Sequence, residues 1–143
     1  MSDEAQVREA SERFYAALSR MAQGSVGSMD DIWSHGSDAT AMHPIAGREV
    51  GWESVRNSFD QFAQIATAGH VALKEQRIRV LGDVAYELGV EHGGGTLGGI
   101  PTTWEHRVTN IYHREDGAWK MVHHHSDVSP AMMDVLRRLQ AQR

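Results

Sequence analysis

The chain has 143 residues, of which 41% are apolar, and it carries a formal net charge of −5. This length predicts one folded domain, residues 1–143, with a single core. The acidic balance argues against nucleic acid as a partner, and the absence of cysteine excludes disulfides, cysteine ligands and cysteine nucleophiles. No stretch has the apolar length of a membrane span and residues 1–18 lack a signal pattern, so we expect a cytoplasmic protein with no membrane partner.

Helical patterns and turn residues organise the first part of the chain. Asp3, with Gln6 three residues later, predicts a helix start, and apolar residues at helical spacing carry this helix to Met21. A second, short helix is expected from Ser28 to near Gly36.

A short strand and a third helix follow. Residues 38–43 predict a strand that ends at His43, because proline comes directly after it. Residues 52–66 carry apolar side chains at helical spacing, which predicts a helix with one face on the core. Trp33, which precedes the strand, fits either the core or the wall of a pocket, and both interpretations stay open.

Residues 71–81 and 84–92 predict a pair of curved strands. The apolar positions change phase within the first segment, which predicts a β-bulge that bends the sheet. In the second segment, alternation assigns two glutamates to the outer face and five other residues to the inner face. The inner set is Val84, Tyr86, Leu88, Val90 and His92, and the outer pair is Glu87 and Glu91. The glycine-rich residues 93–99 predict a mobile hairpin loop.

Residues 104–114 and 118–127 predict one long β-hairpin, since both are rich in β-branched and aromatic residues. Gly117 favours a three-residue loop with a type I turn and a bulge, and Arg114 then pairs with Ala118. A two-residue loop would shift this register by one. The favoured register places Trp104, His106, Val108, Asn110, Tyr112, Val122, His124 and Ser126 inside. It places Arg107, Thr109, Ile111, Trp119, Met121, His123 and His125 outside. A last amphipathic helix is expected from Pro130.

The hairpin resembles two related groups of proteins. The shared residues are Gly99-Ile100-Pro101, Thr109, Arg114, Asp116-Gly117, Trp119 and Val122-His123-x-His125. They are similar to the end of the association domain of calcium/calmodulin-dependent protein kinase II. They are equally similar to SnoaL-like proteins, which include polyketide cyclases and ketosteroid isomerase homologues. The motif His43-Pro44-x-x-Gly47, followed by Gly51-Trp52, resembles the bacterial SnoaL-like group.

This resemblance implies the fold of the nuclear-transport-factor-2-like superfamily. We therefore expect an α+β, cystatin-like cone, in which a curved, mostly antiparallel sheet wraps around N-terminal helices. Such a cone holds a pocket, which we expect to be bounded by Trp33, His43, Tyr86, His92, Trp104, His106, Asn110 and His124. The kinase domain's pocket is lined by arginines, whereas this chain has Leu88, Asn110 and Ser126 at the matching positions.

Within this pocket, we assign catalysis to His106, His124 and Tyr86. Histidine titrates near neutral pH and suits proton transfer, and in the favoured register the two histidines are diagonal neighbours on adjacent strands. Trp33, His43, His92, Trp104 and Asn110 are the expected substrate-binding residues. No inward carboxylate is expected, so the carboxylate base of ketosteroid isomerase has no counterpart in this prediction.

Two functions remain open at this stage. The first is a cofactor-independent enzyme of isomerase, cyclase, hydrolase or lyase type that acts on a small, partly apolar molecule by His-centred acid–base chemistry. The second is a non-catalytic ligand-binding or oligomerising module of the same fold. His123 and His125 could share a metal with a third ligand such as His113, but no metal is predicted. The outer face, formed by Thr109, Ile111, Trp119, Met121, His123 and His125, predicts a homodimer.

Overall fold

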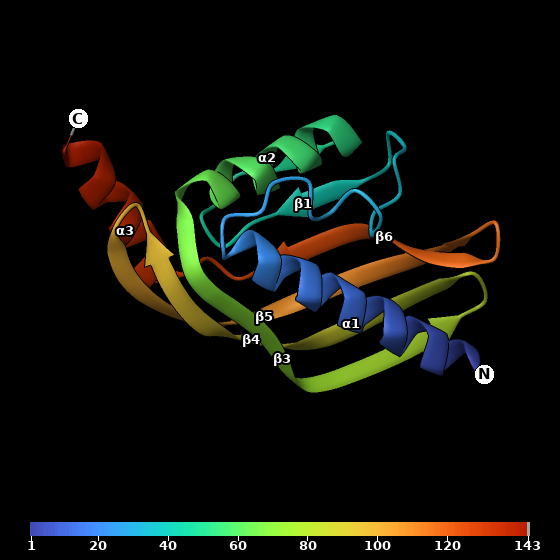
Figure 1. Ribbon diagram of the computed structural model, residues 1–143. Helices are drawn as coiled ribbons and strands as arrows, with labels where there is room; N and C mark the ends of the chain where they lie inside the picture. Colours follow the sequence, from blue (N-terminus) through green and yellow to red (C-terminus); the bar gives the residue numbers. More distant parts are fainter. Residues whose placement is uncertain (143) are drawn as a thin grey trace.

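The computed structural model describes residues 1–142, which form three helices and one six-stranded sheet. Helix α1 (Asp3–Met21) begins at Ser2, whose hydroxyl accepts a hydrogen bond from the Ala5 N–H, so the N-cap is Ser2 and Asp3 lies in the first turn. Helix α1 lies along one face of the sheet, and its buried apolar residues form much of the core (Figure 1).

The sheet has the strand order β2-β1-β6-β5-β4-β3. The strands are β1 (Thr40–Met42), β2 (Glu49–Val50), β3 (Ala66–Leu81), β4 (Val84–Leu97), β5 (Ile100–Glu115) and β6 (Ala118–Ser126). All neighbouring strands are antiparallel except β1 and β6, which pair in parallel. Helix α2 (Trp52–Ile65) lies beside β1, and α3 (Pro130–Ala141) packs at the far end of the sheet near the β4–β5 turn (Figure 1). The predicted α+β architecture, with a curved and mostly antiparallel sheet around helices, is confirmed.

The predicted short helix between Ser28 and Gly36 is wrong. Residues 26–32 form turns, and Gly24 and Gly27 both have positive φ angles. A segment this short gains too few helical hydrogen bonds to offset the cost of nucleation. The chain instead brings Trp33 into an isolated bridge with Met121 of β6, where its side chain is buried.

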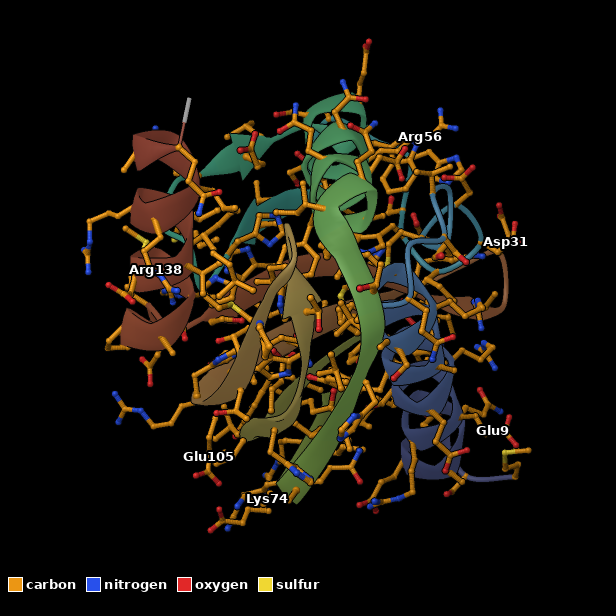
Figure 2. The ribbon with its side chains drawn as sticks, turned by 60° about the vertical axis from the view of Figure 1, so that its left-hand side comes forward. Glu9, Asp31, Arg56, Lys74, Glu105 and Arg138 are labelled. Carbon is orange, nitrogen blue, oxygen red and sulfur yellow. The ribbon has the colours of Figure 1, made fainter. Side chains whose placement is uncertain are left out.

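Strand β3 bends at two irregularities, and the second, which lies within residues 71–81, is the bulge that the phase change in its sequence predicts. The register shifts between Thr67 and His70 and again between Lys74 and Arg77. Ala68 and Glu75, which lie within these shifts, have positive φ angles of 54° and 56°. Bulges increase twist, so they let the long strand follow the curve of the sheet visible in Figure 2.

The predicted loop over residues 93–99 is also wrong, because β4 continues through Leu97 and only Gly98 and Gly99 turn the chain. The glycines are used for close packing. A Cβ atom on Gly93 would lie 2.0 Å from the carbonyl oxygen of His70, and one on Gly95 would lie 2.8 Å from the Cα of Gly69. The missing side chains therefore let β4 approach β3 where the sheet bends.

The β5–β6 hairpin closes with two residues, not the three predicted. Asp116 and Gly117 have φ angles of 51° and 80°, which is the combination of a type I′ turn, and Arg114 pairs with Trp119. A bulge then adds one residue to β6 at Val122, so the register changes again. Trp119 and Met121 consequently lie inside, contrary to the prediction, while His124 and Ser126 also lie inside, as predicted.

The prediction for the two faces of β4 is reversed. Ala85, Glu87 and Glu91 are buried on the inner face, whereas Val84 and Leu88 are 41% and 39% exposed. Tyr86 and His92 therefore lie on the outer face. This inversion brings two carboxylates into the interior, which changes the chemistry available to the protein. Among residues 1–142, no helix combines the length and apolar character needed to span a membrane.

Candidate active site

A cavity of about 260 Å³ lies between the inner face of the sheet, helix α2 and helix α3. Most of its wall is apolar, including Leu18, Met21, Phe59, Phe62, Ile65, Val71, Met132 and Leu136. Its polar lining includes His43, Ser58, Glu91, His106 and His124. An apolar body with a small number of placed polar groups is the usual composition of a small-molecule site.

Glu91 and His106 form the central pair of this polar group. They occupy directly paired positions on β4 and β5, and Nε2 of His106 lies 2.8 Å from Oε1 of Glu91. Both side chains are buried, and Nδ1 of His106 has no hydrogen-bond partner among residues 1–142. A carboxylate only accepts, so the contact places a proton on Nε2. In the neutral ring, Nδ1 then keeps a free lone pair.

The Glu91 carboxylate is stabilised by a second donor, the hydroxyl of Tyr15, which lies 2.8 Å from Oε2. Burial by itself would raise the pKa of Glu91, but His124, His106 and Tyr15 outweigh it and hold the pKa below its usual value. Burial and the Glu91 charge raise the pKa of Tyr15 well above its ordinary value, so Tyr15 keeps its proton to donate. Glu91 is therefore ionised and fixed at neutral pH.

His124 lies beside this pair but is oriented by a different residue. Its Nδ1 lies 2.6 Å from Oδ1 of Asn110, and its Nε2 lies 3.1 Å from Oγ of Ser126 and 3.8 Å from Oε2 of Glu91. Burial lowers the pKa of His124 to about 4, against an opposing contribution from Glu91. The ring is therefore neutral at pH 7.

Asn110 is itself fixed by a second buried carboxylate, Glu87. The Asn110 amide nitrogen donates to the Tyr15 hydroxyl and to Oε1 of Glu87, at 3.0 Å each. The amide oxygen therefore faces His124 and accepts its Nδ1 proton. Tyr112 and Gln76 also donate to Glu87, at 2.8 Å and 2.6 Å. This network sets the tautomer of His124 from behind the cavity.

His43 lines the cavity from the loop that follows β1. Its Nε2 lies 2.7 Å from the hydroxyl of Ser58, which in turn donates to the carbonyl of Val55 at 2.6 Å. Burial lowers the pKa of His43 to about 4, although Glu91 acts in the opposite direction. This ring is also neutral at pH 7.

The SnoaL-like domain family matches residues 7–132 of this chain. The chain belongs to the SnoaL-like family. No curated protein matches it. The match covers most of this SnoaL-like domain, including every strand and the polar group around Glu91.

Solved structures share the fold of this SnoaL-like domain. An NTF2-like protein from Streptomyces avermitilis, provisionally named a dehydratase, is 23% identical with a TM-score of 0.78, covering 88% of this chain and 95% of its own. A provisionally named calcium/calmodulin-dependent protein kinase type II association domain from Thiobacillus denitrificans is 25% identical, with a TM-score of 0.70 and coverages of 83% and 91%. A provisionally named aromatic ring hydroxylase from Novosphingobium aromaticivorans is 17% identical, with a TM-score of 0.74 and 88% coverage of each chain.

The structure brings some of the predicted site residues into this SnoaL-like cavity and excludes others. His43, Trp104, His106 and His124 line the cavity. Asn110 is fully buried behind His124. The assignments of Tyr86 and His92 to the pocket are wrong, because the reversed phase of β4 puts both on the outer face. Trp33 packs in the core near Phe14, Trp52 and Phe59 and does not line the cavity.

The predicted register between His106 and His124 is also wrong. Asn110, not Val108, pairs with His124, so the two histidines are not diagonal neighbours. They instead meet through Glu91, which comes from β4 and contacts both rings. Sequence reasoning missed Glu91, although one signal was present: on β4 the glutamates alternate with the small residues Ala85 and Gly89, which leave room for a crowded inner face.

His123 and His125 lie on the outer face, with ring centroids 6.1 Å apart. Nδ1 of His123 contacts the hydroxyl of Thr40 at 2.7 Å. His113, the third ligand considered from the sequence, pairs with Lys120 further along the hairpin. Within residues 1–142, no three such side chains gather in a group able to hold a metal ion.

Proposed function

We propose that this SnoaL-like domain is a cofactor-independent enzyme of isomerase or lyase type, which moves a proton within a small, partly apolar molecule held in the cavity. The observation that carries the proposal is the environment of His106. Its Nε2 contacts a buried carboxylate, its Nδ1 has no partner among the described residues, and its ring lines the cavity. A carboxylate that orients one nitrogen of an imidazole leaves the other nitrogen suited to acid–base catalysis.

In this proposal Nδ1 of His106 takes a proton from the substrate, and the electron pair of the broken bond stays on the substrate. The imidazolium that forms is stabilised by the Glu91 carboxylate at 2.8 Å. In an isomerisation, the same proton returns to a different substrate atom. In an elimination, the electron pair forms a carbon–carbon double bond and expels a hydroxyl group, which takes the proton from Nδ1 and leaves as water.

Two further features support an enzyme over a binding module. The cavity is open enough to hold a ligand, whereas a collapsed cone would favour a structural role. The carboxylate is already ionised and held by Tyr15, so stabilising the imidazolium needs little reorganisation. The provisional names dehydratase and ring hydroxylase, given to two structural neighbours, also support this proposal.

His124 keeps a supporting role in the proposal, and Tyr86 has none. His124 is held neutral by burial, with Asn110 on its Nδ1 and Ser126 on its Nε2, so it contributes a fixed, uncharged wall beside Glu91. His43 and Trp104 contribute to substrate binding through the cavity wall.

The experiment that tests this function is a panel of small hydroxy-ketones, enones and β-hydroxy carbonyl compounds incubated in D₂O and followed by proton NMR. The wild-type protein should catalyse deuterium incorporation or loss of water for at least one compound. His106→Gln should lower that rate by roughly 100-fold or more, because removing a general acid–base group typically costs that much.

The matched control is His113→Gln, which makes the same substitution at an exposed position of the same strand and should leave the rate unchanged. A folded His106→Gln protein that works as fast as the wild type would refute the proposed role. If compounds bind in the cavity and none reacts, the domain is the non-catalytic module that the sequence left open.

A further inference from the structure

The hydrogen-bond directions around the cavity specify which chemical groups it can accept. At His43, the Ser58 hydroxyl has one proton, and the carbonyl of Val55, 2.6 Å away, can only accept it. The 2.7 Å contact between His43 and Ser58 therefore uses a proton on Nε2 of His43. In the neutral ring, Nδ1 is left as an acceptor.

The same reasoning applies to the other two histidines. Nδ1 of His124 donates to Asn110, whose amide nitrogen is committed to Tyr15 and Glu87, so Nε2 of His124 is an acceptor. Nε2 of His106 donates to Glu91, so Nδ1 of His106 is an acceptor. All three rings thus have their protons directed into the protein. The Nε2 lone pair of His124 accepts from the Ser126 hydroxyl at 3.1 Å, whereas the Nδ1 lone pairs of His43 and His106 are left over.

The charge of the cavity wall is negative. The Glu91 carboxylate is ionised and buried, and Glu49 also lines the wall. Among the described residues, no lysine or arginine lines this cavity. The buried indole N–H of Trp104 is a donor without a partner in residues 1–142, and it is uncharged.

We infer that the molecule held in this cavity directs hydrogen-bond donors, hydroxyl or ammonium groups, toward Glu91, His43 and His106, and carries no anionic group. The inference rests on the proposed function only in placing the substrate in this cavity. An anion here would be buried beside a carboxylate with no cation to offset it, which is among the most costly arrangements in a protein interior. A carbonyl oxygen can be accommodated toward the uncharged side-chain amide of Gln61, which also lines the cavity.

The test uses four probes with one skeleton, so that only the head group differs. They are 1-naphthylmethanol, 1-naphthylmethylamine, 1-naphthaldehyde and 1-naphthoate, which present a hydroxyl, an ammonium, an acceptor alone and an anion. Their affinities for the wild-type protein are measured by titration calorimetry at about pH 7.5, where His43 and His124 are both neutral.

The alcohol and the amine should bind, and their relative affinities show which donor the cavity prefers. The aldehyde should bind roughly tenfold more weakly than the alcohol. It has no hydrogen-bond donor, so the acceptors of the cavity stay unpaired and its own carbonyl oxygen is buried beside them. The naphthoate should bind roughly 100-fold or more weakly than the alcohol. Three results would each overturn the inference. They are equal affinities for all four probes, binding of naphthoate as tight as that of the alcohol, and failure of both the alcohol and the amine to bind.

Glu91→Gln provides a second, charge-specific test. Removing the carboxylate should raise the affinity ratio of naphthoate to naphthylmethylamine by roughly tenfold or more. The control is Glu105→Gln, which removes the same charge from an exposed residue on the neighbouring strand β5; Figure 2 shows Glu105 beside Lys74, directed outward. An unchanged ratio in a folded Glu91→Gln protein would contradict the inference.

These binding results are separable from the proposed catalysis. If the alcohol and the amine bind selectively while no compound in the reaction panel exchanges deuterium, the ligand class stands and the proposed function falls. If an anionic compound binds and reacts through His106, the proposed function stands and the ligand class falls.

Discussion

Oε1 of Glu91 lies 2.8 Å from Nε2 of His106, across directly paired positions of β4 and β5. The Glu91 side chain and the backbone of both residues are held in place. Tyr15 of α1 donates to the other carboxylate oxygen, and the backbone positions are held by the sheet. A pair built on rigid strands is positioned more precisely than one carried by loops, which suits a proton-transfer group.

The buried neutral histidines predict a loss of stability in mild acid. The pKa of His43 is about 4 in the folded protein and about 6.5 when the chain is unfolded. Between these values the unfolded state binds more protons, so the stability that His43 contributes is complete above about pH 6.5 and falls as the pH drops toward 4. From pH 7.5 to pH 4.5, this one ring should account for about 2 to 3 kcal/mol of the free energy of unfolding.

His43→Gln keeps a donor near Ser58 and removes the titration. Urea unfolding of this variant should show a shallower dependence on pH over that interval than the wild type. The exposed His113→Gln variant serves as the control and should follow the wild type. If the free energy of unfolding changed with pH by the same amount in the wild type and in His43→Gln, the ring of His43 would not be held neutral.

Glu87→Gln should destabilise the fold although no atom is removed from the packing. Glu87 is fully buried and accepts hydrogen bonds from Tyr112, Asn110 and Gln76. An amide has only one accepting oxygen, so at least one donor would face another donor. We expect a loss of about 2 to 3 kcal/mol in the free energy of unfolding, measured by chemical denaturation.

The same substitution at the exposed Glu105 should change the free energy of unfolding by no more than about 0.5 kcal/mol. If Glu87→Gln were equally neutral, the network behind His124 would not hold Asn110 in the orientation described above.

The general architecture could be predicted from the sequence because helical spacing and strand composition are local signals. Helix α2, helix α3 and the curvature of β3 all follow from apolar periodicity, from Pro130 and from the phase change within β3. The bulge at Val122 could not be predicted, since it compensates for the two-residue turn and has no distinct residue pattern. It explains why His124 faces inward although the predicted register is wrong.

The key carboxylate could not be predicted because β4 carries apolar residues on its outer face. Val84, Tyr86, Leu88 and Val90 alternate as a buried face would, and the glutamates then read as solvent-exposed. Burial of a glutamate depends on partners from distant strands and helices, such as His106 and Tyr15, which a strand pattern does not reveal.

That apolar outer face leads us to propose a homodimer through β4, β5 and β6. The face presents two rows of paired residues, Tyr86 with Ile111 and His123, and Leu88 with Thr109 and His125. Leu88 is 39% exposed, and Leu88→Glu would place a charge among these rows. Sedimentation at micromolar concentration should show a dimer for the wild type and a monomer for this variant.

Val26→Glu, at a turn residue that is 59% exposed, is the control and should remain dimeric. A wild-type protein that sediments as a monomer at that concentration would rule out the interface. A Leu88→Glu protein that remains a dimer would place the contact elsewhere.

The most direct test of the central claim is the tautomer of His106, read from the nitrogen-15 shifts and two-bond couplings of its imidazole at about pH 7.5. The account predicts a proton on Nε2, held by Glu91, and an unprotonated Nδ1. In Glu91→Gln this preference should weaken, whereas Glu105→Gln should leave the spectrum unchanged. A ring protonated on Nδ1 alone in the wild-type protein, or one that carries protons on both nitrogens, would contradict the claim that Nδ1 of His106 is the free base.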